Sequence, residues 1–312
     1  MTQTGYPELT PTQKGALFMG NGAIAFPHND PDNAVDYTGL TGTLTLDQYI
    51  DIVNNATIDL YFRIVATILS GDPSKWSSGS PGTWDIGLVG DGDKSSYCWE
   101  PSRDIPTTKT TESLRLYLKA YTDAGYTILY GEDYTDYSFQ FFDHTEGALV
   151  DWADFENTLD GWARSHANFG TFDVNYPYTG AYSFRLGWSA ALDDTYNCAN
   201  DSSGTLVPNQ TYYISKTIDV SGYNTAYLII HSTRQTAGLA AKSDPKVIRI
   251  WTTTKDYLIR INRADDTTQP WRIAIPLPCV SDVIKITAGF SAMIAGAYKN
   301  NWIDSVFVVG FT

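Results

Sequence analysis

The sequence predicts an all-β protein in which two β-sandwich domains follow an extended N-terminal arm. Apolar and polar residues alternate along many short segments, which is the period of a half-buried strand rather than of a helix. Aromatic residues make up 14% of the 312 residues and charged residues only 18%, a balance that suits pleated sheets. Turn-forming residues separate the alternating segments, and the chain is long enough for a core in each of two domains.

Residues 1–40 show no sustained alternation and are punctuated by Pro7, Pro11, Pro27 and Pro31. A segment with so little periodic apolar surface does not fold by itself. We therefore expect an extended arm that docks on its own domains or on a neighbouring subunit.

Residues 41–146 alternate strongly enough to predict an all-β domain of about six strands. The segments 43–52 and 58–68 have the clearest strand period. Leu114, Leu116 and Leu118 alternate with polar residues, and a strand would place all three on one face. We predict that these leucines are buried and that the domain ends near residues 143–147.

Residues 147–312 form the second predicted domain, in which turn signals separate short strands and no convincing helix occurs. An acidic segment at 154–156 and a Gly-Trp turn at 161–162 lie near the start of this half, and a hydrophobic segment at 302–308 lies near its end. This layout predicts a sandwich whose first and last strands meet. The candidate strands are residues 170–176, 181–188, 212–220, 226–233, 246–253, 257–263, 271–276, 283–290 and 303–309.

Several motifs in this half resemble those of a known group of domains. Asp154-Phe155-Glu156, Asp160-Gly161-Trp162 and the segment 180–186 are similar to the entry of MAM-type and carbohydrate-binding-module jelly rolls. The segments 213–221 and 302–306 are similar to a following strand and to the closing strand of those domains. The resemblance covers roughly residues 150–312 and implies a jelly-roll sandwich. Nothing comparable covers residues 1–146.

The resemblance also implies a structural calcium ion where the first strand meets the last. Glu156 and Asp304 match the ligand positions, and backbone carbonyls of the turn at Gly180 are candidate further ligands. Two carboxylates at such a seam repel each other unless a cation or hydrogen-bond donors lie between them. Solvated or hydrogen-bonded carboxylates, or a nearby Arg or Lys, are the alternatives.

Four aromatic residues of this half are candidate glycan ligands. Trp and Tyr rings bind the apolar faces of sugars, and polar neighbours fix the hydroxyl groups. The four residues are Trp188, Tyr196, Trp251 and Trp271. The alternative is that each of them belongs to the core or to an interface.

Composition and missing motifs exclude several function classes. The net charge of −14, without a basic cluster, argues against nucleic acid and anionic membranes. No apolar segment is long enough to insert in a membrane, and we see no signal peptide. Catalytic motifs are absent and the four histidines are scattered, so we expect no enzyme activity. Cys198 and Cys279 could pair or remain free thiols.

These observations favour a non-enzymatic structural or recognition protein of a virus particle, such as a capsid decoration, spike or tail component. Such a chain would be assembled in the host cytoplasm and exposed outside the cell. Its partners would be neighbouring virion subunits, including copies of itself, and a cell-surface glycan. The alternatives are a carbohydrate-active enzyme or its accessory carbohydrate-binding module, and an assembly protein without a ligand.

Overall fold

The computed structural model describes residues 8–10, 15–19, 22–28, 32–40, 42–54, 56–76, 82–99, 102–167, 169–174, 180–189, 212–234, 246–261, 271–290 and 299–312. These residues form an all-β protein, as predicted. The helices in this part of the chain are two three-residue 3-10 turns, Pro73–Lys75 and His144–Glu146. Neither turn has the length that a membrane-spanning helix requires.

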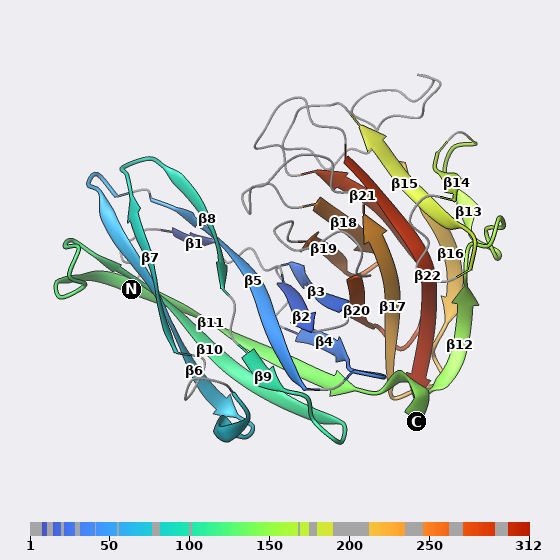
Figure 1. The fold of residues 1–312 in the computed structure, drawn as a ribbon, viewed down its shortest axis with the longest axis horizontal. Coiled ribbons are helices and arrows are strands. Elements are labelled where there is room, and N and C mark those ends of the chain that lie inside the picture. Colours follow the sequence, from blue (N-terminus) through green and yellow to red (C-terminus); the bar gives the residue numbers. More distant parts are fainter. Residues whose placement is uncertain are drawn as a thin grey trace.

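A five-stranded sheet dominates the N-terminal half (Figure 1). Its strands, in spatial order, are β4 (Asp32–Asp36), β11 (Leu129–Phe142), β10 (Thr110–Tyr121), β6 (Leu60–Ser70) and β7 (Thr83–Val89). β4 runs parallel to β11, and the other pairs are antiparallel. The strand period places Leu114, Leu116 and Leu118 inward at 0%, 4% and 5% exposure, which confirms the prediction for these residues.

A second layer packs against one face of this sheet (Figure 1). It is built around β5 (Thr43–Val53), which pairs with β1 (Glu8–Thr10), β2 (Gly15–Met19), β8 (Lys94–Trp99) and β9 (Ser102–Asp104). Side chains from both layers, among them Ile52, Phe62 and Phe139, form one buried cluster. The first half is therefore a sandwich with its own core.

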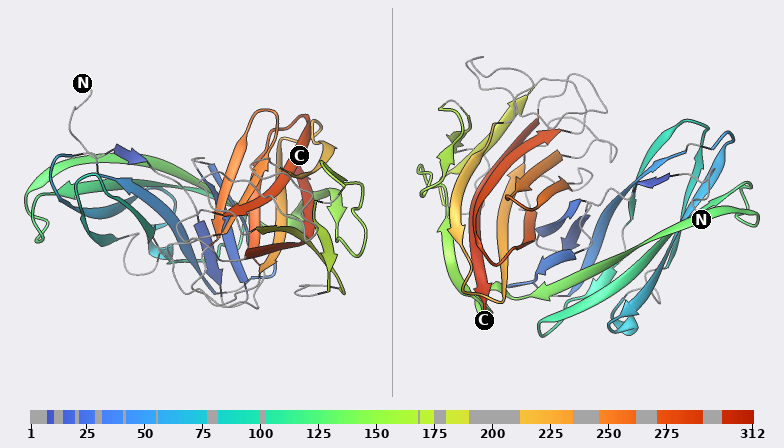
Figure 2. Two further views of the ribbon diagram at one scale, coloured as in Figure 1. Left: turned by 90° about the horizontal axis from the view of Figure 1, so that it is seen from above. Right: turned by 180° about the vertical axis from the view of Figure 1, so that it is seen from behind.

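The C-terminal half is a sandwich of two layers (Figure 2). The first layer contains β12 (Ala148–Ala153), β14 (Thr171–Asp173), β15 (Ser183–Ser189), β17 (Thr225–Arg234), β20 (Trp271–Leu277) and β22 (Lys299–Phe311). The second contains β13 (Ala163–Arg164), β16 (Ile214–Asp219), β18 (Lys246–Trp251), β19 (Asp256–Ile261) and β21 (Ser281–Phe290). Ile and Val side chains of both layers fill the core between them. Each of the nine candidate segments contains or overlaps a strand.

The first and last strands of this sandwich meet, as the sequence predicts. β12 pairs antiparallel with the second half of β22, from Ala148 opposite Gly310 to Ala153 opposite Val306. The first half of β22 pairs with β15, and its other edge pairs with β17. The closing strand is therefore central to its layer.

The N-terminal arm pairs with both halves of its own chain. β2 forms a hairpin with β3 (Gly22–His28) and also pairs with β5. β3 in turn pairs with β20 and β19, one strand from each layer of the C-terminal sandwich. Backbone pairing thus runs continuously from one half into the other. Docking of the arm on a neighbouring subunit stays a prediction.

Candidate functional site

The predicted calcium position is a turn whose carboxylate is held by backbone amides. Glu156 follows β12, and both of its carboxylate oxygens lie 3.0 Å from the amide nitrogen of Ala181. One oxygen lies 3.2 Å from the amide of Tyr182. The turn at Gly180 therefore offers N–H donors to Glu156, where the sequence suggested carbonyl ligands. Gly180 has a φ of +66°, a conformation that favours glycine. A Cβ at this position would overlap the Glu156 carboxylate.

Asp304 lies in β22 and is almost fully buried, at 1% exposure. Its neighbour Ile303 pairs with Phe184, three residues after the amide donor Ala181. Among the described residues, no group of three or more His, Cys, Asp or Glu side chains could hold a metal ion. Calcium at Glu156 and Asp304 therefore stays a prediction.

The structure places three of the four candidate aromatic residues on strands of different layers. Trp251 ends β18 in the second layer, whereas Trp188 lies in β15 and Trp271 opens β20 in the first. Tyr196 lies outside the described residues, as does Cys198. Trp251 is the one of the four whose side-chain surroundings are described.

Trp251 belongs to a partly exposed cluster of rings and charges on the second layer. Its ring contacts that of Tyr213 edge to face, with centroids 5.3 Å apart. Trp251 is paired with Lys285 across the sheet, and the Lys285 ammonium lies 5.2 Å from the Tyr213 centroid. The Arg249 guanidinium lies 4.9 Å from the Trp251 ring. We call Tyr213, Arg249, Trp251, Asp256 and Lys285 the Trp251 cluster.

The charged groups of the Trp251 cluster have fixed positions. Arg249 binds Asp256 through two hydrogen bonds of 2.9 and 2.6 Å, and the two residues lie on the neighbouring strands β18 and β19. A bidentate pair of this kind holds donors and acceptors in one plane. The cluster thus presents ring surface and oriented hydrogen-bonding groups together.

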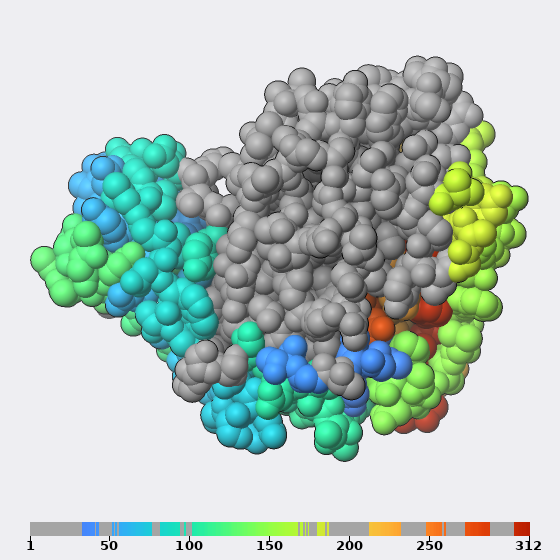
Figure 3. All heavy atoms as spheres, in the orientation of Figure 1, coloured from blue at the N-terminus to red at the C-terminus, as the bar shows by residue number. Residues whose placement is uncertain are grey.

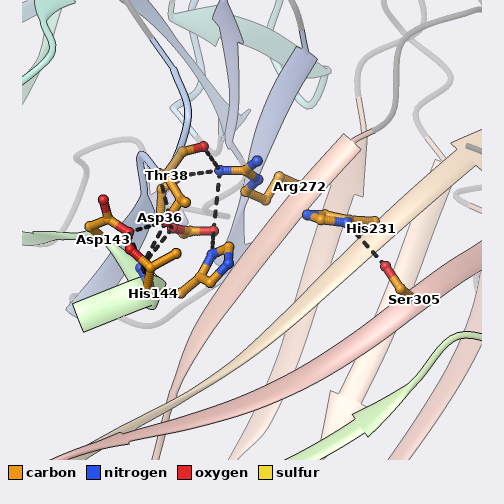
Figure 4. Close-up of polar contacts among 8 residues, drawn as sticks. Asp36, Thr38, Asp143, His144, His231, Arg272 and Ser305 are labelled. Carbon is orange, nitrogen blue, oxygen red and sulfur yellow. Dashed lines mark hydrogen bonds and ion pairs between the residues drawn. The ribbon is translucent and has the colours of Figure 1, made fainter. Parts of the chain in front are cut away.

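A buried polar network joins the two sandwiches (Figure 4). Asp36, at the end of β4, is 0% exposed. One of its oxygens lies 2.9 Å from Nδ1 of His144 and 3.2 Å from the Arg272 guanidinium of β20. Its other oxygen accepts the Thr38 hydroxyl at 2.6 Å. Burial alone raises the pKa of Asp36, but His144 and Arg272 outweigh burial and lower that pKa below its ordinary value.

Arg272 adds backbone contacts that fix the position of β4. Its Nη1 donates to the carbonyl oxygens of Asp36 at 3.1 Å and of Thr38 at 2.9 Å. The amide of His144 donates to the Thr38 hydroxyl oxygen at 2.8 Å. The Arg272 guanidinium of the C-terminal sandwich therefore binds the segment 36–38, which in turn binds His144.

A serine–histidine pair lies beside this network (Figure 4). The Ser305 hydroxyl lies 3.0 Å from Nδ1 of His231. Both residues are buried, and burial lowers the pKa of His231 to about 3, helped by the charge of Arg272. A nucleophile needs access to its substrate as well as a base. Burial of the hydroxyl and of the imidazole favours a packing role for this pair.

Sequence reasoning did not find the residues of this network. Asp36 and Arg272 are 236 positions apart, and no motif links them. The one available signal is the acidic, histidine-containing segment 143–146 at the predicted domain boundary. That segment becomes a 3-10 turn whose cap, Asp143, accepts the amide of Thr145 at 2.9 Å.

No protein-family model matches the chain, and no curated protein matches it. The xylan-binding domain CBM22-1 of Paenibacillus barcinonensis Xyn10C is 11% identical, with a TM-score of 0.32, over 53% of this chain and 97% of that one. SGBP-B from a xyloglucan utilization locus of Bacteroides uniformis is 11% identical, with a TM-score of 0.32, over 98% and 100%. The CBM22-1–CBM22-2 tandem of Xyn10C is 12% identical, with a TM-score of 0.33, over 99% and 94%. Similarity this weak assigns neither a family nor a function.

Proposed function

We propose that the chain is a non-catalytic recognition protein whose C-terminal sandwich binds glycan through the Trp251 cluster. The observation that carries the proposal is the partly exposed pair of rings formed by Trp251 and Tyr213. Aromatic rings stack on the apolar C–H faces of sugars. Lys285 and the bidentate Arg249–Asp256 pair border the rings with groups that bind hydroxyls.

A binding role fits this cluster better than catalysis. Glycoside hydrolysis uses two carboxyl groups on either side of the scissile bond. The one carboxylate of the Trp251 cluster, Asp256, is engaged by Arg249 through both oxygens. A carboxylate held in this way orients donors and is poorly placed to act as a general acid.

The proposal keeps the predicted setting, in which the chain is a component of a virus particle and contacts further copies of itself. This setting is supported by composition, because the chain is acidic and rich in Tyr, Thr, Asn and Trp. The alternative is a carbohydrate-active enzyme or its accessory carbohydrate-binding module, and the Trp251 cluster gives the virus particle no support over it. Mass spectrometry of purified particles distinguishes the two, because an accessory module is absent from them.

The test of glycan binding is a glycan array followed by calorimetry on the glycans that bind. We expect Trp251→Ala to weaken binding to the C-terminal sandwich by about tenfold or more, a loss of about 1.4 kcal/mol. Trp152→Ala is the matched control, because Trp152 is another exposed tryptophan of the same sandwich, at 52% exposure. The proposal fails if no glycan binds, or if both variants bind as tightly as the parent chain.

A further inference from the structure

The outer face of the five-stranded sheet carries an unusual density of tyrosine. Alternation along β6 and β10 sends residues such as Phe62 and Leu116 into the core, and the residues between them point outward. β7 and β11 border these strands. Strands of this sheet form much of the surface of the left lobe in Figure 3. Five tyrosines define what we call the tyrosine face: Tyr61, Tyr117, Tyr121, Tyr126 and Tyr134.

The five rings form two groups. Tyr126, at the turn after β10, contacts Tyr61 and Tyr121 edge to face, with centroids 6.2 and 5.4 Å apart. Tyr117 and Tyr134 are directly opposite each other in the register of β10 and β11, with centroids 5.6 Å apart. Each of these rings is partly or largely exposed, and Tyr134 is 51% exposed. The face therefore presents aromatic surface to solvent at two separate positions.

Three cross-strand ion pairs lie among the rings. Arg115 binds Asp136 through two hydrogen bonds of 2.6 and 2.7 Å. The other pairs are Arg63–Asp85 at 2.5 Å and Lys119–Glu132 at 2.6 Å. The charges of the three cations and the three acids cancel, so these six residues have no net charge, although the net charge of the whole chain is −14.

The cations of these pairs also contact the rings. The Arg115 guanidinium lies 4.0 Å from the Tyr134 centroid, and that of Arg63 lies 4.1 Å from the Tyr126 centroid. The Lys119 ammonium lies 5.3 Å from the Tyr117 centroid. Each cation is thus held by a carboxylate and by a ring, which limits its motion and fixes the direction of its donors.

From this geometry we propose that the tyrosine face is a second binding site, and that its ligand is a neutral polysaccharide. The rings supply surface for the C–H faces of sugars, and the ion pairs supply oriented donors and acceptors for hydroxyls. This site lies in the N-terminal sandwich and does not depend on the Trp251 cluster.

Charge decides between this ligand and the other classes. A polyanion is bound by cations that release counterions, and each of Arg63, Arg115 and Lys119 already has a carboxylate partner. The core of a protein–protein interface is depleted in Lys, Glu and Asp. Here Lys119 and Glu132 lie between the two ring groups. A neutral, hydroxyl-rich ligand fits both observations.

The spacing of the rings favours a polymer over a single sugar. Tyr117 and Tyr121 are four residues apart on β10, which corresponds to about 13 Å along a strand. The face also extends across β6, β10 and β11, about 10 Å at the usual strand separation. A ligand that contacts both ring groups must therefore contain several sugar units.

The experiment measures retention of the full chain in native gels that contain xyloglucan, xylan, galactan or mannan, and on suspended cellulose. The Trp251→Ala chain serves as the background, so that the remaining binding reports the tyrosine face. We expect this chain to be retained by at least one of the five polysaccharides. Adding Tyr117→Ala and Tyr134→Ala should reduce the affinity by about tenfold or more.

Matched variants distinguish an effect of lost ring contacts from an effect of lost folding. Tyr117→Phe with Tyr134→Phe keeps both rings, so we expect its affinity to stay within about threefold of the background. Melting curves establish that each variant is folded. Polygalacturonate, an anionic polymer, should not retain the chain.

Three outcomes overturn the inference. First, the Trp251→Ala chain could lose all retention by the polysaccharides. That result would reject the second site and leave the proposed function intact. The alanine pair could bind as tightly as its background, so that the rings have no role. Retention by polygalacturonate instead of the neutral polymers would show that the ligand class is wrong.

Discussion

The ring of Phe142 stacks on the ring of Tyr227, with centroids 4.0 Å apart and an angle of 13° between the planes. Phe142 is the last residue of β11 in the N-terminal sandwich, and Tyr227 lies in β17 of the C-terminal sandwich. Phe311 packs against both rings, and the Tyr227 hydroxyl donates to Gln140 at 2.6 Å. Together with the Asp36–Arg272 network, these contacts hold the two sandwiches in one relative orientation.

Removing this ring should destabilise the contact between the two sandwiches. Phe142 is 0% exposed, and we expect Phe142→Ala to cost about 3–5 kcal/mol of unfolding free energy, measured in urea. Since the lost contacts join two separate cores, we expect the variant to unfold in two transitions. Leu149→Ala is the control, because its side chain is 61% exposed and should change stability by less than about 0.5 kcal/mol. A small effect of Phe142→Ala would mean that the polar network and the pairing of β3 with β19 and β20 hold the sandwiches without this ring.

A buried ion pair in the N-terminal core gives a second prediction. Arg103 and Glu112 are 3% and 2% exposed, and Arg103 Nε donates to Glu112 at 2.8 Å. The indole nitrogen of Trp76 donates to the same oxygen at 3.2 Å. Arg103→Met should cost about 3–5 kcal/mol, because it leaves a carboxylate buried without its main partner.

The control for this pair is Arg115, an arginine on the other layer of the same sandwich. Arg115 also binds its carboxylate through two hydrogen bonds, but Arg115 and Asp136 are 28% and 44% exposed. Arg115→Met should therefore cost no more than about 1 kcal/mol. Chemical denaturation of both variants checks the difference. Equal losses would contradict the assignment of the effect to burial.

The strands were predictable from the sequence because their period is local. The leucines of β10 and the strands of the C-terminal half follow from alternation within each segment, and the β12–β22 pairing follows from the two ends of that half. The contact between the two sandwiches was not predictable. Asp36 and Arg272 meet only because β4 and β20 are brought together by the packing of two sandwiches, and no local pattern encodes that contact.

The tyrosine face illustrates a different limit. Tyr117 and Tyr121 are visible in the sequence as the outward residues of a strand whose leucines face inward. Their partners are set by register, which pairs Tyr117 with Tyr134 and Tyr121 with Tyr61. Register depends on turn geometry and on the burial of whole strands. The composition of the face therefore becomes clear only when the strands are paired.

Burial of His231 predicts a pH dependence of stability. Its pKa is about 3 in the folded chain and about 6.5 when unfolded. Between about pH 3 and pH 6.5, the His231 side chain binds a proton in the unfolded chain and not in the folded chain. The unfolding free energy should therefore fall as the pH decreases below about 6.5, by up to about 1.4 kcal/mol per pH unit from this group.

The measurement is urea unfolding at several pH values between 7 and 4. His231→Asn should reduce the slope of stability against pH, since asparagine does not titrate there. His166→Gln serves as the control, because it removes a partly exposed histidine in place of the buried one. An unchanged slope in His231→Asn would assign the pH dependence to other groups.

The turn at Gly180 should tolerate no side chain. Its φ is +66°, and a Cβ would overlap the Glu156 carboxylate that the turn binds through the amides of Ala181 and Tyr182. Gly180→Ala should therefore lower the melting temperature through both backbone strain and loss of these hydrogen bonds. Gly222→Ala is the control, because its Cβ would meet no atom within 4 Å. Equal melting temperatures for the two variants would show that the turn rearranges freely.

Chelation tests whether calcium adds to these amide donors at Glu156 and Asp304. A cation bound only by the folded state raises stability as RT ln(1 + [L]/Kd), so EDTA should lower the melting temperature of the parent chain. Asp304→Ala should remove that difference, because one of the two proposed carboxylate ligands is lost. The amides of Ala181 and Tyr182 already donate hydrogen bonds to the Glu156 carboxylate. If EDTA leaves the parent melting temperature unchanged, these donors suffice and the calcium hypothesis is wrong.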